Sequence, residues 1–249
     1  FNIKKFETED LRIQINFQIK GMKSKSLSNE FGELVLGMRS AYKDGKNAME
    51  YARSYMLSKG AIDSRNDQTA ITVAYDLQSG GYADYCEKHP DFDIKWGSQV
   101  TKEIEPFLPP NGTLLEVGVG EATTLSRVIS TLSNKPSRCI GFDISWSRIK
   151  IANQWLKKNS NKADLLVGDI FNIPLAENSV DIVYSSHSLE PNGGKEELLM
   201  KECLRVARKA VIFIEPIYEL AKEEAKKCMR HHGYIRGLYD IASEMDCSI

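Results

Sequence analysis

The sequence predicts an α/β fold with a doubly wound, mostly parallel sheet, preceded by a mainly helical N-terminal region. Two observations support this fold class. Short apolar runs alternate with amphipathic segments after residue 110, and a glycine-rich turn follows the first run. Near-continuous apolarity over about five residues is typical of strands buried on both faces of a parallel sheet, and such sheets bind ligands at the carboxyl ends of their strands. The five predicted strands are Thr113–Val117, Arg138–Phe142, Ala163–Val167, Val180–Tyr184 and Ala210–Ile214.

Amphipathic segments between these runs predict the helices that connect the strands. Their apolar residues recur at steps of three and four, as on one face of a helix. The three stripes begin at Leu125, Ile149 and Leu199. After the fifth run, residues 218–245 predict one or two helices with a turn near His232-Gly233.

The first hundred residues follow different patterns, and we expect an accessory region over residues 1–100 that packs on a core over residues 101–249. Alternating apolar and polar residues over Leu11–Ile19 predict a half-buried strand. Helical periodicity follows over residues 31–42 and 48–56. Residues 61–100 are less regular, and their aromatic side chains together with Gly80-Gly81 are consistent with a mobile loop that covers the ligand site, with an ordinary core or surface position as the alternative for each aromatic residue. The aromatic residues concerned are Tyr75, Tyr82 and Trp96.

Composition narrows the classes of function and location. The chain of 249 residues carries 33 Lys and Arg against 34 Asp and Glu, a net charge of −1. A dedicated nucleic-acid-binding protein needs a cationic excess, so we expect no nucleic-acid partner. No apolar run approaches the ~20 residues that cross a bilayer and no signal peptide is evident, so we expect no membrane association and a cytoplasmic location. The five scattered cysteines lack C-x-x-C spacing, which argues against a metal site or a disulfide framework.

A glycine-rich motif, LLEVGVGEATT, lies between the first predicted strand and the following helix. Gly118 and Gly120 permit unusual backbone angles and let a ligand approach the main chain, where helix N-terminal amides face it. A dinucleotide fingerprint, G-x-G-x-x-G, would need a third glycine where the chain has Thr123. The alternative pattern, acidic-x-G-x-G-x-G/A, is matched by Glu116, the two glycines and Ala122. On this motif the chain resembles class I S-adenosylmethionine-dependent methyltransferases, whose fold is Rossmann-like.

Two acidic residues at the ends of later strands extend the resemblance. Asp143 ends the second strand 25 residues after the first glycine, where a carboxylate can accept hydrogen bonds from both ribose hydroxyls, although an acid after a strand is often only a helix cap. The resemblance implies that Ile144 packs on the adenine, that the Asp169 carboxylate binds the adenine amino group and that the backbone amide of Ile170 meets the ring. It also implies that the fourth strand and its loop, with Ser185, lie beside the methionine half of the cofactor.

The resemblance covers roughly residues 96–217, with one departure. The sheet of the family normally continues with an antiparallel strand hairpin, whereas residues 218–245 of this chain predict helices. The hairpin is therefore absent, truncated or replaced, and the predicted strand at Leu11–Ile19 is one candidate for that edge of the sheet.

A sulfonium cofactor supplies its own electrophile, so the protein must orient it, exclude water and place a nucleophile in line. His187, on the loop after the fourth strand, is the candidate base, because an imidazole with a pKa near 6.5 can take a proton from a hydroxyl or an amine at neutral pH. Glu190 is placed to orient this histidine or the substrate, and Glu215 at the end of the fifth strand is a further candidate. Each of the three has a structural role as its alternative.

The sequence therefore predicts an enzyme that uses S-adenosylmethionine to methylate an oxygen or nitrogen atom of a small molecule, such as a sugar or another secondary metabolite. The alternatives are a methyltransferase that acts on tRNA or protein, a catalytically degenerate cofactor-binding scaffold, and a nicotinamide dehydrogenase, which Thr123 disfavours. The pattern does not identify the acceptor or the oligomeric state, and a homodimer is one alternative.

Overall fold

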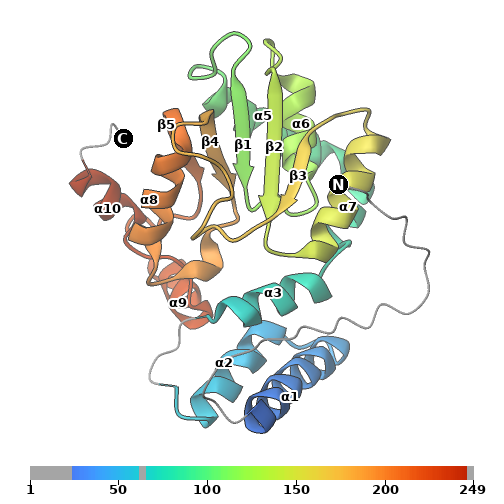
Figure 1. Ribbon diagram of the computed structural model, residues 1–249, viewed down its shortest axis with the longest axis vertical. Helices are drawn as coiled ribbons and strands as arrows, with labels where there is room; N and C mark the ends of the chain where they lie inside the picture. The colour runs from blue at the N-terminus through green and yellow to red at the C-terminus, as the bar shows by residue number, and fades with distance from the viewer. Residues whose placement is uncertain (1–23, 62–65, 246–249) are drawn as a thin grey trace.

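A computed structural model describes residues 24–61 and 66–245 of the chain (Figure 1). Five parallel strands form one sheet in the order β3-β2-β1-β4-β5. The strands are β1 Thr113–Val117, β2 Arg138–Asp143, β3 Asp164–Val167, β4 Val180–Ser186 and β5 Ala207–Ile214. The predicted α/β fold with a parallel sheet and a helical N-terminal region is confirmed, and each strand coincides with one of the five apolar runs.

Helices connect the strands and extend the chain at both ends of the sheet. Before β1 the chain forms α1 Ser24–Lys43, α2 Ala48–Ser58, α3 Gln68–Leu77, α4 Gly81–Lys88 and α5 Pro90–Ile104. The connections between strands contain α6 Thr123–Thr131, α7 Trp146–Lys158 and α8 Glu196–Val206, with a short 3₁₀ turn over Glu190–Asn192. The segment after β5 forms α9 Glu223–His232 and α10 Leu238–Glu244, as the predicted turn at His232-Gly233 required.

The sheet is covered on both faces, because successive side chains of a strand point in opposite directions. Leu114 packs into the cluster that α5, α6 and α7 form on one face, whereas Leu115 packs into the cluster of α8 and α10 on the other. Both side chains are fully buried. This double coverage explains why the strands read as short, nearly continuous apolar runs.

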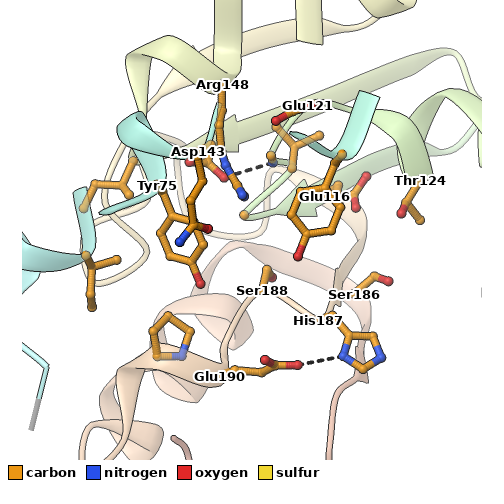
Figure 2. Close-up of a pocket in the computed structure, with 18 of the residues that line it drawn as sticks. Tyr75, Glu116, Glu121, Thr124, Asp143, Arg148, Ser186, His187, Ser188 and Glu190 are labelled. Carbon is orange, nitrogen blue, oxygen red and sulfur yellow. Dashed lines mark hydrogen bonds and ion pairs between the residues drawn. The ribbon is translucent and has the colours of Figure 1, made fainter. Parts of the chain in front are cut away.

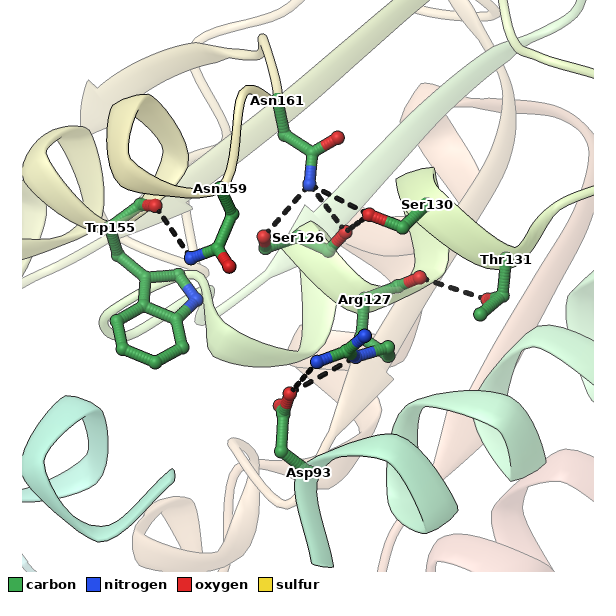
Figure 3. Close-up of polar contacts among 8 residues, drawn as sticks. All are labelled: Asp93, Ser126, Arg127, Ser130, Thr131, Trp155, Asn159 and Asn161. Atoms are coloured by element: carbon green, nitrogen blue, oxygen red, sulfur yellow. Dashed lines mark hydrogen bonds and ion pairs between the residues drawn. The ribbon is translucent and has the colours of Figure 1, made fainter. Parts of the chain in front are cut away.

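Polar contacts fix the helices of the first face to one another (Figure 3). The buried Asp93 of α5 accepts hydrogen bonds from the Arg127 guanidinium of α6, including one of 3.0 Å from Nε. Asn161, just after α7, donates to the backbone oxygen of Ser126 at 2.8 Å and to the hydroxyls of Ser126 and Ser130. These contacts hold α6 in place, and α6 starts at the glycine-rich motif.

Helices α1, α2 and α3 form a small apolar core of their own, built mostly of alanine and methionine. Helix α3 lies across the carboxyl ends of the strands (Figure 1) and joins this core to the sheet. Its Asp76 accepts hydrogen bonds from the Ser145 hydroxyl and, at 3.1 Å, from the backbone amide of Ser147, at the N-terminus of α7. The N-terminal region therefore covers the edge of the sheet at which a ligand is expected.

The prediction of a mobile loop around Gly80-Gly81 is wrong, because the segment forms a tight turn between the helices α3 and α4. Asp67 caps the N-terminus of α3 by accepting from the backbone amides of Thr69 and Ala70. Gly80 has a φ of 97° and begins α4 without a side chain of its own to cap it. The missing cap comes from Glu121, which is distant in sequence and was not considered as a partner.

Strand β5 forms one edge of the sheet within the described residues. It is followed by α9 and α10, in the segment where helices were expected in place of the family's strand hairpin. The predicted strand at Leu11–Ile19 lies outside the described residues. The predicted boundary between residues 100 and 101 falls inside α5, which packs on α6 and on the sheet, and the division of the chain there stays a prediction. Across residues 24–61 and 66–245, no helix has the length and apolarity of a membrane span.

Candidate functional site

The glycine-rich turn leaves β1 with three residues in the left-handed backbone region. Gly118 and Gly120 have φ values of 66° and 54°, and Ala122, which precedes α6, has a φ of 56°. A Cβ atom on Gly118 would lie 2.5 Å from Cβ of Ser188, so glycine is required there for both conformational and steric reasons. The turn brings the N-terminus of α6 and the loop after β4 close together.

Asp143, at the end of β2, is bound to this turn. Its Oδ2 accepts a hydrogen bond of 2.9 Å from the backbone amide of Gly120, and its Oδ1 accepts one of 2.8 Å from Ser145. Burial raises the pKa of the Asp143 carboxyl, and these two amides together with the Arg148 charge oppose that effect. The carboxyl group is therefore held in one orientation beside the glycine-rich turn before any ligand arrives.

A cavity of about 540 Å³ lies between the carboxyl edge of the sheet and the helices α3 to α5. This volume is within the range of about 300–1,000 Å³ that is usual for small-molecule sites. Of the predicted site residues, the cavity is lined by Glu116, Gly118, Gly120, Asp143, Ile144, Ile170, His187 and Glu190. The predicted cover residues Tyr75, Tyr82 and Trp96 line it as well.

Three predicted residues do not line the cavity. Ser185 is fully buried in β4, and its neighbour Ser186 lines the cavity instead. Glu215 accepts hydrogen bonds from the backbone amides of Ser188 and Leu189, at 3.1 and 3.3 Å, and so supports the loop that carries His187. Burial raises the pKa of Glu215 to about 7.

Asp169 is the third of these residues, and the reason is a side chain that sequence analysis did not consider. The amide nitrogen of Gln68, in α3, donates a hydrogen bond of 3.1 Å to Asp169 Oδ1. The backbone amide of Phe171 donates to the same oxygen at 3.0 Å. Gln68 lines the cavity, whereas Asp169 does not.

His187 and Glu190 form a hydrogen-bonded pair on the wall opposite Asp143 and Arg148 (Figure 2). The distance from His187 Nδ1 to Glu190 Oε1 is 2.7 Å, and this hydrogen bond raises the pKa of His187 although burial opposes it. His187 has a φ of 51°, a conformation that costs a residue other than glycine about 1–2 kcal/mol. The ring of Trp96 lies 5.1 Å from the imidazole, centre to centre, and its nitrogen donates to Ser186 at 3.1 Å.

Arg148 is a functional candidate that the sequence analysis missed. It lies in the first turn of α7, three residues after the helix cap Ser145, and its guanidinium lies 4.4 Å from the Tyr75 ring and 5.0 Å from the Tyr82 ring. Its Nε and Nη2 atoms are buried and have no hydrogen-bond partner within the described part of the chain. The signal in the sequence was a cation at a position of α7 that faces inward, one helical turn after the acid that ends β2.

Glu121 is a second residue that was missed, although it stands within the glycine-rich motif. Its buried carboxylate accepts from the backbone amides of Gly80 at 2.8 Å and Ala83 at 2.6 Å, and therefore caps the N-terminus of α4. An acid at this place is stabilised by the unpaired amides and the dipole of the helix. The contact attaches the cover of the cavity directly to the glycine-rich turn.

Comparisons with known proteins agree with this geometry. The sequence profile of the family described as "Methyltransferase domain" matches residues 115–214, which run from β1 to the end of β5. No curated protein matches the sequence.

Solved structures with a related arrangement include a SAM-dependent methyltransferase from Aquifex aeolicus, which is 20% identical with a TM-score of 0.45 over 60% of this chain and 78% of that one. The YcgJ protein from Bacillus subtilis is 14% identical with a TM-score of 0.48 over 59% and 64%. A geranyl diphosphate C-methyltransferase from Streptomyces coelicolor A3(2), solved with S-adenosyl-L-homocysteine, is 13% identical with a TM-score of 0.48 over 59% and 57%. The chain thus spans less than two thirds of the latter two proteins.

The profile match covers nearly the whole sheet, and it includes the glycine-rich turn and Asp143 at the carboxyl edge of the strands. The segment from β1 to β5 therefore resembles a methyltransferase domain.

Proposed function

We propose that this chain transfers the methyl group of S-adenosylmethionine to an oxygen or nitrogen atom of a small-molecule acceptor. The observation that carries the proposal is the cavity of about 540 Å³, whose walls unite the glycine-rich turn, Asp143 and the His187–Glu190 pair. The wall with Asp143 thus suits a nucleoside, and the opposite wall offers His187 as a proton acceptor.

The polar groups of the cavity fit the cofactor. Asp143 keeps its carboxylate oriented by two amides, and each oxygen has a further lone pair with which to accept from a ribose hydroxyl. Two nitrogens of the Arg148 guanidinium, Nε and Nη2, have no partner among the described residues and suit the carboxylate of the methionine half. Ile144 and Ile170 would flank the adenine, and the glycine-rich turn would lie against the methionine half.

When bound, the cofactor supplies an electrophilic methyl group on a sulfonium centre. The chain contributes a proton acceptor, because the hydrogen bond to Glu190 places the proton of the neutral imidazole on Nδ1 and leaves Nε2 of His187 free to accept. Trp96 packs on the same imidazole and limits its rotation. The Glu215 carboxyl group binds the backbone of this loop and so fixes the position of the base.

A second hollow, of about 550 Å³, supports a small acceptor with an apolar part. It shares Glu190 and Tyr234 with the cavity and is otherwise formed by the segment after β5. Its apolar lining consists of Pro216, Ile217, Leu220, Ala221, Ala225 and Met229. An acceptor that extended from this hollow past Glu190 would present its polar end to His187.

The direct test is calorimetric titration with S-adenosylhomocysteine. We expect the wild type to bind, and Asp143→Asn to weaken binding about ten- to a hundredfold, because a charge-assisted hydrogen bond to ribose is worth about 1.5–3 kcal/mol. Asp164→Asn is the matched control, since Asp164 is an exposed strand residue that pairs with Arg138 at 2.6 Å, away from the cavity. A folded wild type that does not bind at millimolar ligand would refute the proposal.

The acceptor class is tested with labelled S-adenosylmethionine and a panel of small hydroxyl and amine compounds, compared with bulk tRNA and protein. Transfer of label to a small compound, with a loss of at least tenfold in His187→Asn, supports the proposed chemistry. Transfer to tRNA or protein alone would overturn the acceptor class, and no transfer to any acceptor would favour a cofactor-binding scaffold.

A further inference from the structure

Gln68 is the residue of α3 that separates the cavity from the acid after β3. It is the first residue of the helix, and Asp67 before it caps the helix, so the backbone at this position is fixed. The Gln68 side chain lines the cavity together with Ile144, Gly168 and Ile170, which mark the end of the site nearest to β3. Asp169 lies behind Gln68 and does not line the cavity.

The hydrogen bond to Asp169 determines the orientation of the Gln68 amide. A carboxylate oxygen accepts hydrogen bonds, so the amide nitrogen must face it, and the 3.1 Å distance from Nε2 to Oδ1 agrees with this. Asp169 is itself held by the backbone amide of Phe171. The Gln68 oxygen therefore faces away from Asp169, and the amide cannot reverse without losing its hydrogen bond to Asp169.

The amide oxygen of Gln68 is buried, and no donor among residues 24–61 and 66–245 forms a hydrogen bond with it. Buried acceptors without a donor are uncommon in folded proteins and unfavourable, because the group has lost its water. A ligand that enters the cavity with an N–H group at this end would supply the missing donor. The exocyclic amino group of adenine carries such a donor, and its ring would lie between the apolar side chains of Ile144 and Ile170.

We infer that Gln68 accepts a hydrogen bond from the adenine amino group of the cofactor, and that Asp169 acts as a positioning residue that orients the Gln68 amide. This inference rests on the proposed function. It transfers the role expected for the carboxylate of Asp169 to a residue of the N-terminal region, outside the segment that matches the family profile. The N-terminal region then contributes to the choice of cofactor as well as covering it.

The experiment compares S-adenosylhomocysteine with S-inosylhomocysteine, which carries an oxygen in place of the amino group, by calorimetry. We expect the wild type to prefer the adenosyl compound about ten- to a hundredfold, and Gln68→Met to reduce this preference to about threefold or less. Asp169→Asn should keep most of the preference, because an asparagine oxygen can still accept from Gln68. Gln78→Met is the matched control, since Gln78 lines the same cavity at the other end of α3 and should leave the preference unchanged.

Thermal unfolding of each variant confirms that the folded protein is titrated. A preference that survives Gln68→Met but is lost in Asp169→Asn would overturn the inference and return the contact to Asp169. A preference unchanged in both variants would also overturn it. Failure of the wild type to bind either compound would refute the proposed function together with the inference, whereas binding with unaltered preference refutes the inference alone.

Discussion

Glu116 should make the free energy of unfolding fall as the pH rises, and the substitution Glu116→Gln should remove this contribution. It lies in β1 on the face covered by α6, is 2% exposed, and accepts a hydrogen bond of 2.8 Å from the hydroxyl of Tyr184. Burial raises the pKa of its carboxyl from the ordinary value of 4.5 to about 8, although the hydrogen bond from Tyr184 opposes this. Between these two pKa values, Glu116 therefore keeps a proton in the folded protein that it releases in the unfolded chain.

The sign follows from proton linkage. Because the pKa is higher in the folded state, the stabilisation is fully present below pH 4.5 and is lost as the pH rises through about 8. At about 1.4 kcal/mol for each pH unit, the difference between the two pKa values corresponds to about 5 kcal/mol at pH 9. Glutamine retains an oxygen that accepts from Tyr184 and does not titrate, so Glu116→Gln should be more stable than the wild type by about 2–5 kcal/mol at pH 9.

Urea unfolding followed by circular dichroism between pH 5 and pH 9 measures this difference. The two proteins should be similar at pH 5 and diverge progressively above pH 6, with equal slopes in urea. Titrating groups that do not interact with Glu116 affect both proteins alike and cancel in the comparison. Glu103→Gln, at an exposed position of α5, is the control and should follow the wild type. Stability curves of the wild type and Glu116→Gln that run parallel from pH 5 to pH 9 would refute the reasoning.

Two further predictions concern the loops around the cavity. Gly118→Ala should destabilise the fold by about 2 kcal/mol or more, because the new Cβ meets Ser188 and the backbone is left-handed. The control Gly32→Ala, at an open helical position, should be neutral or stabilising by about 0.5–1 kcal/mol. Equal changes in the free energy of urea unfolding for the two variants would contradict this prediction. Glu190→Gln should lower the pKa of His187, because it removes the charged hydrogen-bond partner; a nuclear magnetic resonance titration of the imidazole that is unchanged would rule out this coupling.

Much of the sheet and of its ligand-binding edge could be read from local sequence. Strands covered on both faces require mostly apolar side chains, so the runs that became β1 to β5 were visible as such. Gly118 and Asp143 were found for a similar reason, since a left-handed turn after a strand and an acid at the end of the next strand are specified by neighbouring residues. The His187–Glu190 pair is also local, because the two residues are three apart.

The contacts of the N-terminal region were decided only by tertiary structure. Glu121 caps a helix about forty residues earlier in the chain, and Gln68 reaches an acid 101 residues away. No periodicity or motif records such pairs, because each depends on how α3 and α4 fold back over the edge of the sheet. The sequence by itself determined which strands form the sheet and at which edge of it the glycine-rich turn lies, since burial and backbone conformation act on adjacent residues. The residues of α3 to α5 that line the cavity were decided by the packing of helices whose partners are distant in the chain.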